Sequence, residues 1–84
     1  MMTKVAMISG ASRGIGRAIA EELGRQGIAL SLAIRDSALA PGEGFAPAGM
    51  MSFAYQATDP GSERAWVEAT MAHFGRIDIL VNNA

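Results

Sequence analysis

The chain has 84 residues, of which 50% are hydrophobic and 18% are charged, so it can form at most one small globular domain. A formal net charge of -1 gives no electrostatic basis for binding nucleic acid or an anionic membrane. The absence of cysteine excludes disulfides and thiolate metal sites. No apolar run reaches the roughly 18 residues of a membrane span, and the first residues show no signal-peptide pattern. We therefore expect a soluble, cytoplasmic protein.

The first predicted strand is Lys4 to Ser9, whose nearly continuous apolar character is typical of a strand buried on both faces of a parallel sheet. A glycine-rich segment, Ser9-Gly10-Ala11-Ser12-Arg13-Gly14-Ile15-Gly16, opens a helix predicted from about Ile15 to Gln26. Gly27 stands where a C-terminal cap belongs. The apolar residues that recur at helical spacing are Ile15, Ile19, Ala20 and Leu23. A second buried strand, Ile28 to Ile34, completes a β-α-β unit.

The middle of the chain predicts a loop followed by a third strand. Between Ser37 and Gly49, prolines and glycines exclude a long helix, and one helical turn near Ala38 and Leu39 is the most that we expect there. Met50 to Ala57 is the third predicted strand.

The second predicted helix has clear end signals. Asp59 is the expected N-cap, Pro60 takes the first helical position, and the helix ends at Gly75. One side of this helix is predicted to carry Trp66, Val67, Thr70, Met71 and Phe74. His73, in the last turn, is expected to interact with the helix dipole rather than to bind a metal.

A fourth predicted strand, Ile77 to Val81, contains Asp78, which we expect to pair with a backbone N–H or an arginine in a structural role. The alternation of strands and helices predicts an α/β fold, a Rossmann-type doubly wound parallel sheet with strand order 3-2-1-4. The outer edge of the fourth strand is apolar and uncovered, which complete proteins avoid. We therefore expect residues 1–84 to be the N-terminal half of a larger domain.

The glycine-rich turn between the first strand and the first helix is a candidate phosphate-binding site. Glycines let the backbone approach an anion closely, and free N–H groups at the start of a helix point towards it. Glycine spacing alone is weak evidence, and a purely structural turn is the alternative. The flanking strand and helix favour a dinucleotide as the ligand.

Two segments of the chain resemble motifs of the short-chain dehydrogenase/reductase family. Ser9 to Gly16 is similar to its Thr-Gly-x-x-x-Gly-x-Gly cofactor loop, with Ser9 in place of threonine. Gly75 to Ala84, which reads Gly-Arg-Ile-Asp-Ile-Leu-Val-Asn-Asn-Ala, resembles its fourth strand and the Asn-Asn-Ala-Gly motif as far as alanine. The resemblance implies an oxidoreductase that transfers hydride between a nicotinamide and a carbonyl or alcohol substrate. It also implies cofactor contacts at Asn83 and Ala84.

Physical reasoning and the resemblance agree on the roles within the loop. Gly10 permits the turn, Gly14 lets the pyrophosphate come close, and Gly16 allows the helix to pack against the sheet. Ile15 is expected to offer its backbone N–H to a phosphate oxygen, and Ser12 to add a hydroxyl donor.

The end of the second strand bears on the choice of cofactor. In NAD-selective folds of this kind, an acid about twenty residues beyond the loop binds the ribose 2′-hydroxyl. That position is Ile34 here, followed by Arg35, and Arg13 is a second cation that NADP-preferring family members often carry. A guanidinium can hold a 2′-phosphate through two hydrogen bonds. We expect NADP in preference to NAD, the alternative being two solvated arginines with Asp36 partly neutralising Arg35.

Two features depart from the family pattern at the adenosine half of the cofactor. The family usually places an acid or asparagine after the third strand to meet the adenine, and the matching residue here is Gln56, followed by Ala57. The segment from Ser37 to Gly49 lacks the helix that normally covers the sheet there. We expect this loop to loosen cofactor binding.

No catalytic residue is assigned. The family's proton donor is a tyrosine followed four residues later by a lysine, with a serine upstream, all beyond the Asn-Asn-Ala-Gly motif. This chain has one tyrosine, Tyr55, and its single lysine is Lys4, so that pair cannot form. Because hydride transfer to a carbonyl needs a positioned acid or base, the 84-residue chain alone is expected to be inactive.

Two other functions compete with this interpretation. The chain could be a non-catalytic module that binds NADP(H), or one that packs against a partner completing the sheet. A methyltransferase with a similar glycine loop is disfavoured, because such enzymes need an acid where Arg35 follows the second strand. The intact protein could form a homo-oligomer.

Overall fold

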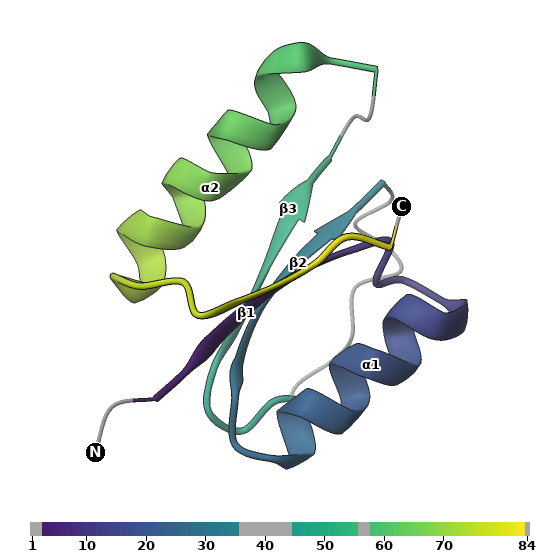
Figure 1. Cartoon of the computed structure of the whole chain (residues 1–84), viewed down its shortest axis with the longest axis vertical. Helices are drawn as coiled ribbons and strands as arrows, with labels where there is room; N and C mark the ends of the chain where they lie inside the picture. Colours follow the sequence, from purple (N-terminus) through teal and green to yellow (C-terminus); the bar gives the residue numbers. More distant parts are fainter. Residues whose placement is uncertain (1–2, 36–44, 56–57, 84) are drawn as a thin grey trace.

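Four parallel strands form one sheet, with a helix on each face (Figure 1). The computed structural model describes residues 3–35, 45–55 and 58–83. Its elements are β1 (Val5–Ser9), α1 (Gly14–Arg25), β2 (Ala29–Ile34), β3 (Met50–Ala54), α2 (Pro60–Phe74) and β4 (Ile79–Val81). The strand order is β3-β2-β1-β4, which confirms the predicted topology. None of the helices in the described ranges is long and apolar enough to cross a membrane.

The strands are one to three residues shorter than predicted, because pairing with a neighbour sets their length. β3 ends at Ala54 since its partner in β2, Ile34, is the last residue of that strand. Tyr55 adds one more backbone hydrogen bond, to the Ile34 carbonyl at 3.0 Å, just beyond the predicted strand's observed end. Residues 56–57 of the predicted strand lie outside the described residues.

The two central strands are buried on both faces, as their apolar runs predicted. Every residue of β1 and β2 is buried. Alternate side chains contact the two helices. The cluster beneath α1 contains Ala6, Ile8, Ala20, Leu30, Leu32 and Ile34, and the cluster beneath α2 contains Met7, Ala33 and Trp66. The sheet therefore has a larger aliphatic core on the α1 face.

The burial of α1 corrects one sequence expectation. The buried residues of this helix are Gly16, Ala20 and Gly24, whereas Ile15 is 72% exposed. A line of small residues lets the helix axis approach its neighbours closely, so the larger side chains flank the contact. The C-terminus is as predicted: Gly27 has φ +83°, and the Ile28 N–H donates to the Leu23 carbonyl at 3.2 Å.

The segment that follows the undescribed residues 36–44 also packs beneath α1. Phe45 is half-buried against this core, and Ala46 is buried within it. Residues 45–49 form bends and a turn, in keeping with the predicted loop. The predicted helical turn near Ala38 and Leu39 lies outside the described residues.

The predicted ends of α2 are confirmed, and its buried face is narrower than predicted. The Asp59 side chain accepts a hydrogen bond from the Gly61 N–H at 2.9 Å, Pro60 begins the helix, and Gly75 ends it at φ +80°. Val67 and Met71 are 39% and 44% exposed, so they do not belong to the buried face. That face consists of Ser62, Trp66 and Thr70.

Polar groups join α2 to the sheet. The Trp66 Nε1–H donates to the Ser31 hydroxyl at 2.9 Å, and this hydroxyl shares a 2.7 Å hydrogen bond with Thr70. The Thr70 hydroxyl also contacts the Trp66 carbonyl at 2.8 Å. All three side chains are buried and satisfied, which fixes the position of α2 over β2.

Asp78 has the structural role predicted for it. Its carboxylate accepts the Val5 N–H at 2.8 Å and is held by the Arg76 guanidinium through two hydrogen bonds of 2.9 and 2.6 Å. The Arg76 hydrogen bonds, followed by that from Val5, lower the pKa of Asp78 below its usual value. This contact fastens the start of β4 to the start of β1.

Candidate functional site

The turn between β1 and α1 has two residues in the left-handed backbone region that favours glycine. Gly10 has φ +62° and Gly14 has φ +65°. A side chain at Gly10 would lie 3.2 Å from the Asn83 carbonyl oxygen, whereas one at Gly14 would meet nothing within 4 Å. The space in front of Gly14 is therefore open, and a ligand could approach the backbone there.

Gly16 has the most restricted surroundings in the turn. A Cβ atom at this position would lie 2.1 Å from the Gly10 carbonyl oxygen and 2.6 Å from Nδ2 of Asn83. Sequence reasoning expected this glycine to let the helix pack against the sheet. The nearest contacts are with Gly10, directly after β1, and with Asn83, which follows β4.

Ser9 connects the two sequence motifs, a role that the sequence did not reveal. The Asn83 N–H donates to the Ser9 hydroxyl at 2.9 Å, and this hydroxyl lies 3.3 Å from Oδ1 of Asn82. The Asn83 side chain donates to the Gly10 carbonyl at 3.4 Å. A hydroxyl residue at the end of an otherwise apolar strand was the available signal, because a buried polar group requires partners.

The N-terminus of α1 lacks a side-chain cap. Arg13 is the N-cap residue, in extended conformation, and its side chain makes no capping hydrogen bond. The first turn of α1, which is fully described, contains no acidic residue. Backbone N–H groups at a helix start normally find a side-chain or ligand acceptor, and the helix dipole favours an anion there. Ile15, which is exposed, lies in this first turn, and the half-buried Ser12 directly precedes the N-cap residue.

Two predicted cations lie at the same edge of the sheet. Ser9, the last residue of β1, is paired with Ala33 in the parallel register, so the glycine turn after β1 and Arg35 after β2 lie at the carboxyl ends of neighbouring strands. Arg13 and Arg35 are both exposed, and neither forms an ion pair with a residue in the described ranges. The arrangement can therefore present positive charge to an anion beside the helix start.

Some predicted site residues cannot be placed. Gln56 and Ala57, the expected adenine contacts, lie outside the described residues, and so do Ala84 and Asp36. Asn83, the remaining predicted site residue of the second motif, lies against the glycine turn. With Asn82, which the Ser9 hydroxyl also contacts, the structure brings two described residues of the second motif to the first.

A small pocket opens on the α2 side of this edge. It has a volume of about 60 Å³ and is lined by Ser9, Tyr55, Glu63, Trp66, Leu80 and Asn82. Dedicated ligand pockets are larger, roughly 300–1,000 Å³. The Tyr55 and Trp66 rings meet edge to face at 5.7 Å, which gives Tyr55 a packing role.

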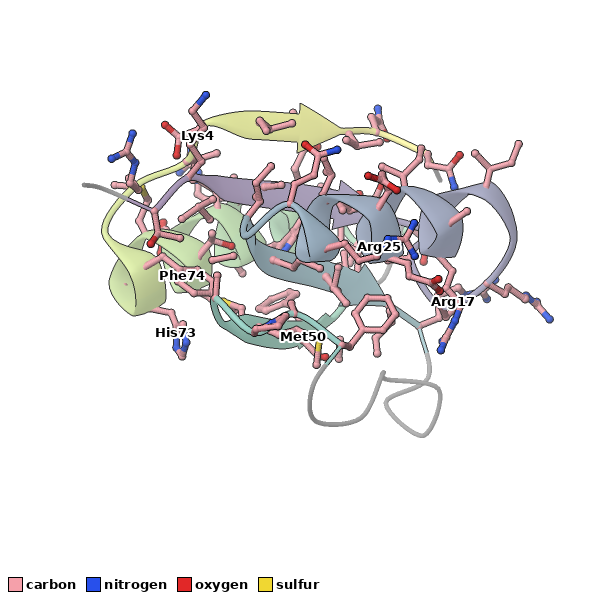
Figure 2. All side chains as sticks on the ribbon, turned by 90° about the horizontal axis from the view of Figure 1, so that it is seen from below. Lys4, Arg17, Arg25, Met50, His73 and Phe74 are labelled. Carbon is pink, nitrogen blue, oxygen red and sulfur yellow. The ribbon has the colours of Figure 1, made fainter. Side chains whose placement is uncertain are left out.

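The single tyrosine and the single lysine are far apart in the fold. Tyr55 follows β3 and Lys4 precedes β1. Because these strands are parallel, Lys4 lies at the amino ends of the strands and Tyr55 at their carboxyl ends. Figure 2 shows Lys4 at the end of the molecule away from the start of α1. They cannot act as a pair on one substrate atom.

Comparisons with known proteins agree with this geometry. The family described as short chain dehydrogenase matches residues 4–84. The 3-oxoacyl-[acyl-carrier-protein] reductase FabG of Staphylococcus aureus strain N315 is 42% identical over 88 residues, covering 99% of this chain and 36% of that protein. The FabG of Escherichia coli strain K12 is 40% identical over 82 residues, covering 96% of this chain and 34% of that protein. The chain thus spans about a third of the length of these relatives.

Solved structures give the same result. A metagenomic short-chain oxidoreductase in complex with NADP has a TM-score of 0.85 and 34% identity, covering 99% of this chain and 40% of its own. A 3-oxoacyl-[acyl-carrier protein] reductase from Brucella melitensis in complex with NAD has a TM-score of 0.84 and 31% identity, covering 100% of this chain and 34% of its own. With the strand order, the glycine turn and the family match in agreement, this chain belongs to the short chain dehydrogenase family.

Proposed function

We propose that residues 1–84 are the N-terminal half of a cofactor-binding domain that takes NADP(H) in preference to NAD(H). The intact protein would be a cytoplasmic oxidoreductase acting on a carbonyl or alcohol. The observation that carries the proposal is the uncapped start of α1 behind an open turn at Gly14. A dinucleotide pyrophosphate supplies the negative charge that such a helix start favours.

The described residues suit this ligand. We assign the pyrophosphate to the backbone of Gly10, Gly14, Ile15 and Gly16, with the Ser12 hydroxyl as an additional donor. Gly14 leaves open space for a phosphate oxygen. The Ile15 side chain is 72% exposed, so we assign only its backbone N–H to the phosphate. The proposal extends to Gln56 and Ala57 at the adenine, and to Asn83 and Ala84 as further cofactor contacts.

Cofactor preference is proposed from charge. Arg13 and Arg35 are exposed, without ion-pair partners in the described ranges, and they follow the carboxyl ends of the paired strands β1 and β2. A 2′-phosphate can accept two hydrogen bonds from one guanidinium. The nicotinamide, when bound, supplies the hydride chemistry. This chain's own residues bind and orient the dinucleotide, and none of the described ones is placed to move the substrate proton.

The names of the relatives are those of reductases, which favours carbonyl reduction as the reaction of the intact protein. One relative is an agropine synthesis reductase of Rhizobium rhizogenes, 43% identical over 86 residues, covering 95% of this chain and 19% of that protein. The family therefore includes reductases of different substrates, and the substrate is proposed only as a small carbonyl compound or the corresponding alcohol.

Titration with NADPH and with NADH tests the proposal, followed by the emission of Trp66 or by calorimetry. We expect NADPH to bind more tightly than NADH. Arg35→Ala should lower the NADPH affinity about tenfold and leave the NADH affinity unchanged. An equal preference for both dinucleotides, or an Arg35→Ala variant that keeps full NADPH affinity, would defeat the 2′-phosphate assignment.

A second function rests on a different observation. Leu80, in the edge strand β4, is 63% exposed, so a non-catalytic module that a partner completes also explains this edge. Turnover of carbonyl substrates with NADPH by the whole protein separates the alternatives, because only an oxidoreductase would show it. From the purified 84-residue chain we expect none under either function, since Tyr55 and Lys4 lie at opposite ends of the strands. Repeatable turnover would show that another acid or base operates.

A further inference from the structure

Arg17 is a third arginine near the start of α1. It lies four residues after Arg13, the N-cap residue, and its N–H donates to the Arg13 carbonyl at 3.4 Å. Arg17 is half-buried and forms no ion pair with any described residue. Figure 2 shows it at the end of the molecule where α1 begins, away from Lys4 and His73.

An aromatic ring holds the Arg17 side chain. The guanidinium carbon lies 5.4 Å from the centroid of the Phe45 ring. The backbone of Phe45 is itself pressed against α1, because a Cβ atom at Gly24 would lie 2.7 Å from the Phe45 carbonyl oxygen. The neighbouring Ala46 is buried in the same core. Phe45 is thus a fixed support and not a solvent-exposed side chain that happens to touch Arg17.

The contact with Phe45 turns Arg17 towards the segment that leads into β3, the neighbour of β2. Phe45 leads into β3, and β3 pairs with β2 at the end of the sheet opposite β4. Arg35 directly follows β2, and the last pair of the β1–β2 register is Ser9 with Ala33, so Arg35 and the glycine turn follow neighbouring strands at the same ends. The three arginines therefore belong to elements at the carboxyl ends of the strands: Arg13 and Arg17 at the start of α1, and Arg35 directly after β2.

A guanidinium stacked on an aromatic ring keeps its N–H donors available. The ring interacts with the face of the cation, whereas hydrogen bonds to an anion are made at its edge. Stacking also reduces the conformational freedom that a long side chain loses when it binds. Phe45 can therefore orient Arg17 and leave its charge intact, whereas a carboxylate partner would neutralise that charge.

We propose that Arg17, oriented by Phe45, is a further specificity-determining residue for the 2′-phosphate of NADP(H), acting together with Arg13 and Arg35. This inference rests on the proposed function. It adds a cation from the helix itself to one from the turn and one from the end of β2. Phe45 is a positioning residue, since it acts through Arg17.

The experiment measures dissociation constants of NADPH and NADH for the full 84-residue chain, and compares their ratio between variants. Arg17→Ala should lower the preference for NADPH about tenfold, the effect of one charge-assisted hydrogen bond, with NADH binding unchanged. Phe45→Leu should lower the NADPH preference about threefold, and Phe45→Tyr, which retains an aromatic ring, should keep the wild-type preference. NADH affinity reports whether each variant still folds.

Arg25 provides a matched control on the same helix. It is paired with Glu21 at 3.0 Å and also with Glu22, so Arg25→Ala removes one positive charge from α1 without touching the proposed site. We expect this variant to keep the wild-type ratio. A loss equal to that of Arg17→Ala would mean that overall charge, and not position, sets the preference, and would overturn the inference.

The remaining outcomes separate this inference from the proposed function. If Arg17→Ala leaves the ratio unchanged while Arg35→Ala lowers it, the inference fails and the proposed function stands. If Arg17→Ala weakens both dinucleotides equally, Arg17 is merely structural and the inference fails. If Phe45→Leu increases the NADPH preference, the ring withholds Arg17 from the ligand, and its positioning role is wrong. If no arginine affects the ratio, the proposed NADP preference itself falls.

Discussion

The two helices of this chain begin at the same edge of the sheet and in opposite ways. The start of α2 is satisfied by its own residues. The Asp59 side chain accepts the Gly61 N–H, Pro60 has no N–H that needs an acceptor, and Glu63 places negative charge in the first turn. The start of α1 is open, since Arg13 caps it with no side-chain hydrogen bond and no acid follows in its fully described first turn.

This difference distinguishes a structural helix start from a binding one. A capping side chain stabilises a helix by roughly 1 kcal/mol, and the dipole of α2 is satisfied from within the chain. α1 forgoes this stabilisation and places cations where a capping carboxylate would stand. Its first turn is therefore suited to an external anion, and the following predictions test this contrast.

The largest effect is expected at Gly16. Gly16→Ala places a methyl group about 2 Å from a backbone carbonyl that cannot move aside without distorting the turn. We expect a loss of about 3 kcal/mol in the free energy of unfolding, measured by urea denaturation, together with loss of dinucleotide binding. The matched substitution in α2 is Gly61→Ala, whose new methyl would meet only the Asp59 side chain at 3.5 Å. Equal destabilisation by both substitutions would contradict the close contact at Gly16.

The next effect comes from giving α1 the cap of α2. Arg13→Asp should stabilise the unliganded chain by about 1 kcal/mol, because a carboxylate can accept the free N–H groups of the first turn. It should weaken NADPH binding about a hundredfold, since the carboxylate occupies the anion's position and a cation is lost. Calorimetry and urea denaturation measure the two changes. Tighter NADPH binding in this variant would show that the helix start does not face the phosphates.

A smaller effect should follow from removing the N-cap side chain of α2. Asp59→Ala removes the side chain that accepts the Gly61 N–H and should lower the free energy of unfolding by about 1 kcal/mol. Dinucleotide affinity should change less than twofold, because this helix start carries no proposed contact with the ligand. Asp59→Asn retains the acceptor and serves as the control. A strong loss of NADPH affinity in Asp59→Ala would indicate that both helix starts contribute to the site.

The smallest effect is a pH dependence from the opposite edge of the sheet. The pKa of Asp78 is lowered in the folded chain, first by Arg76 and then by the Val5 N–H. Its carboxylate therefore contributes stability above the unfolded pKa, and this contribution disappears as the pH falls through the lowered folded value. Urea midpoints of the wild type and of Asp78→Asn should converge as the pH falls below about 4. A difference that stays constant over that range would exclude the ionised carboxylate as its source.

Much of the fold could be predicted from local signals. The uninterrupted apolar runs of β1 and β2 indicated a parallel sheet, and Asp59, Pro60 and Gly75 marked the ends of α2 correctly. These features depend on backbone geometry within a few residues. Strand order followed from the alternation of strands and helices, which indicated a doubly wound fold.

The contacts between distant segments could not be predicted in the same way. Periodicity places residues on one side of a helix, but it does not tell how much of that side is covered, and so Ile15, Val67 and Met71 were misassigned. The Ser9–Asn83 hydrogen bond and the support of Arg17 by Phe45 depend on how separate elements meet. Only the three-dimensional packing reveals such pairs.

The Ser9–Asn83 contact also bears on the order in which the chain folds. The two residues are 74 positions apart, and β4 must settle beside β1 before they can meet. Contacts of such long range form late, because closing a long segment of chain costs entropy before it gains any bonding. During synthesis on the ribosome, the glycine turn would thus acquire its final shape only after nearly the whole segment has emerged, and a nascent chain would gain affinity for its ligand at that moment.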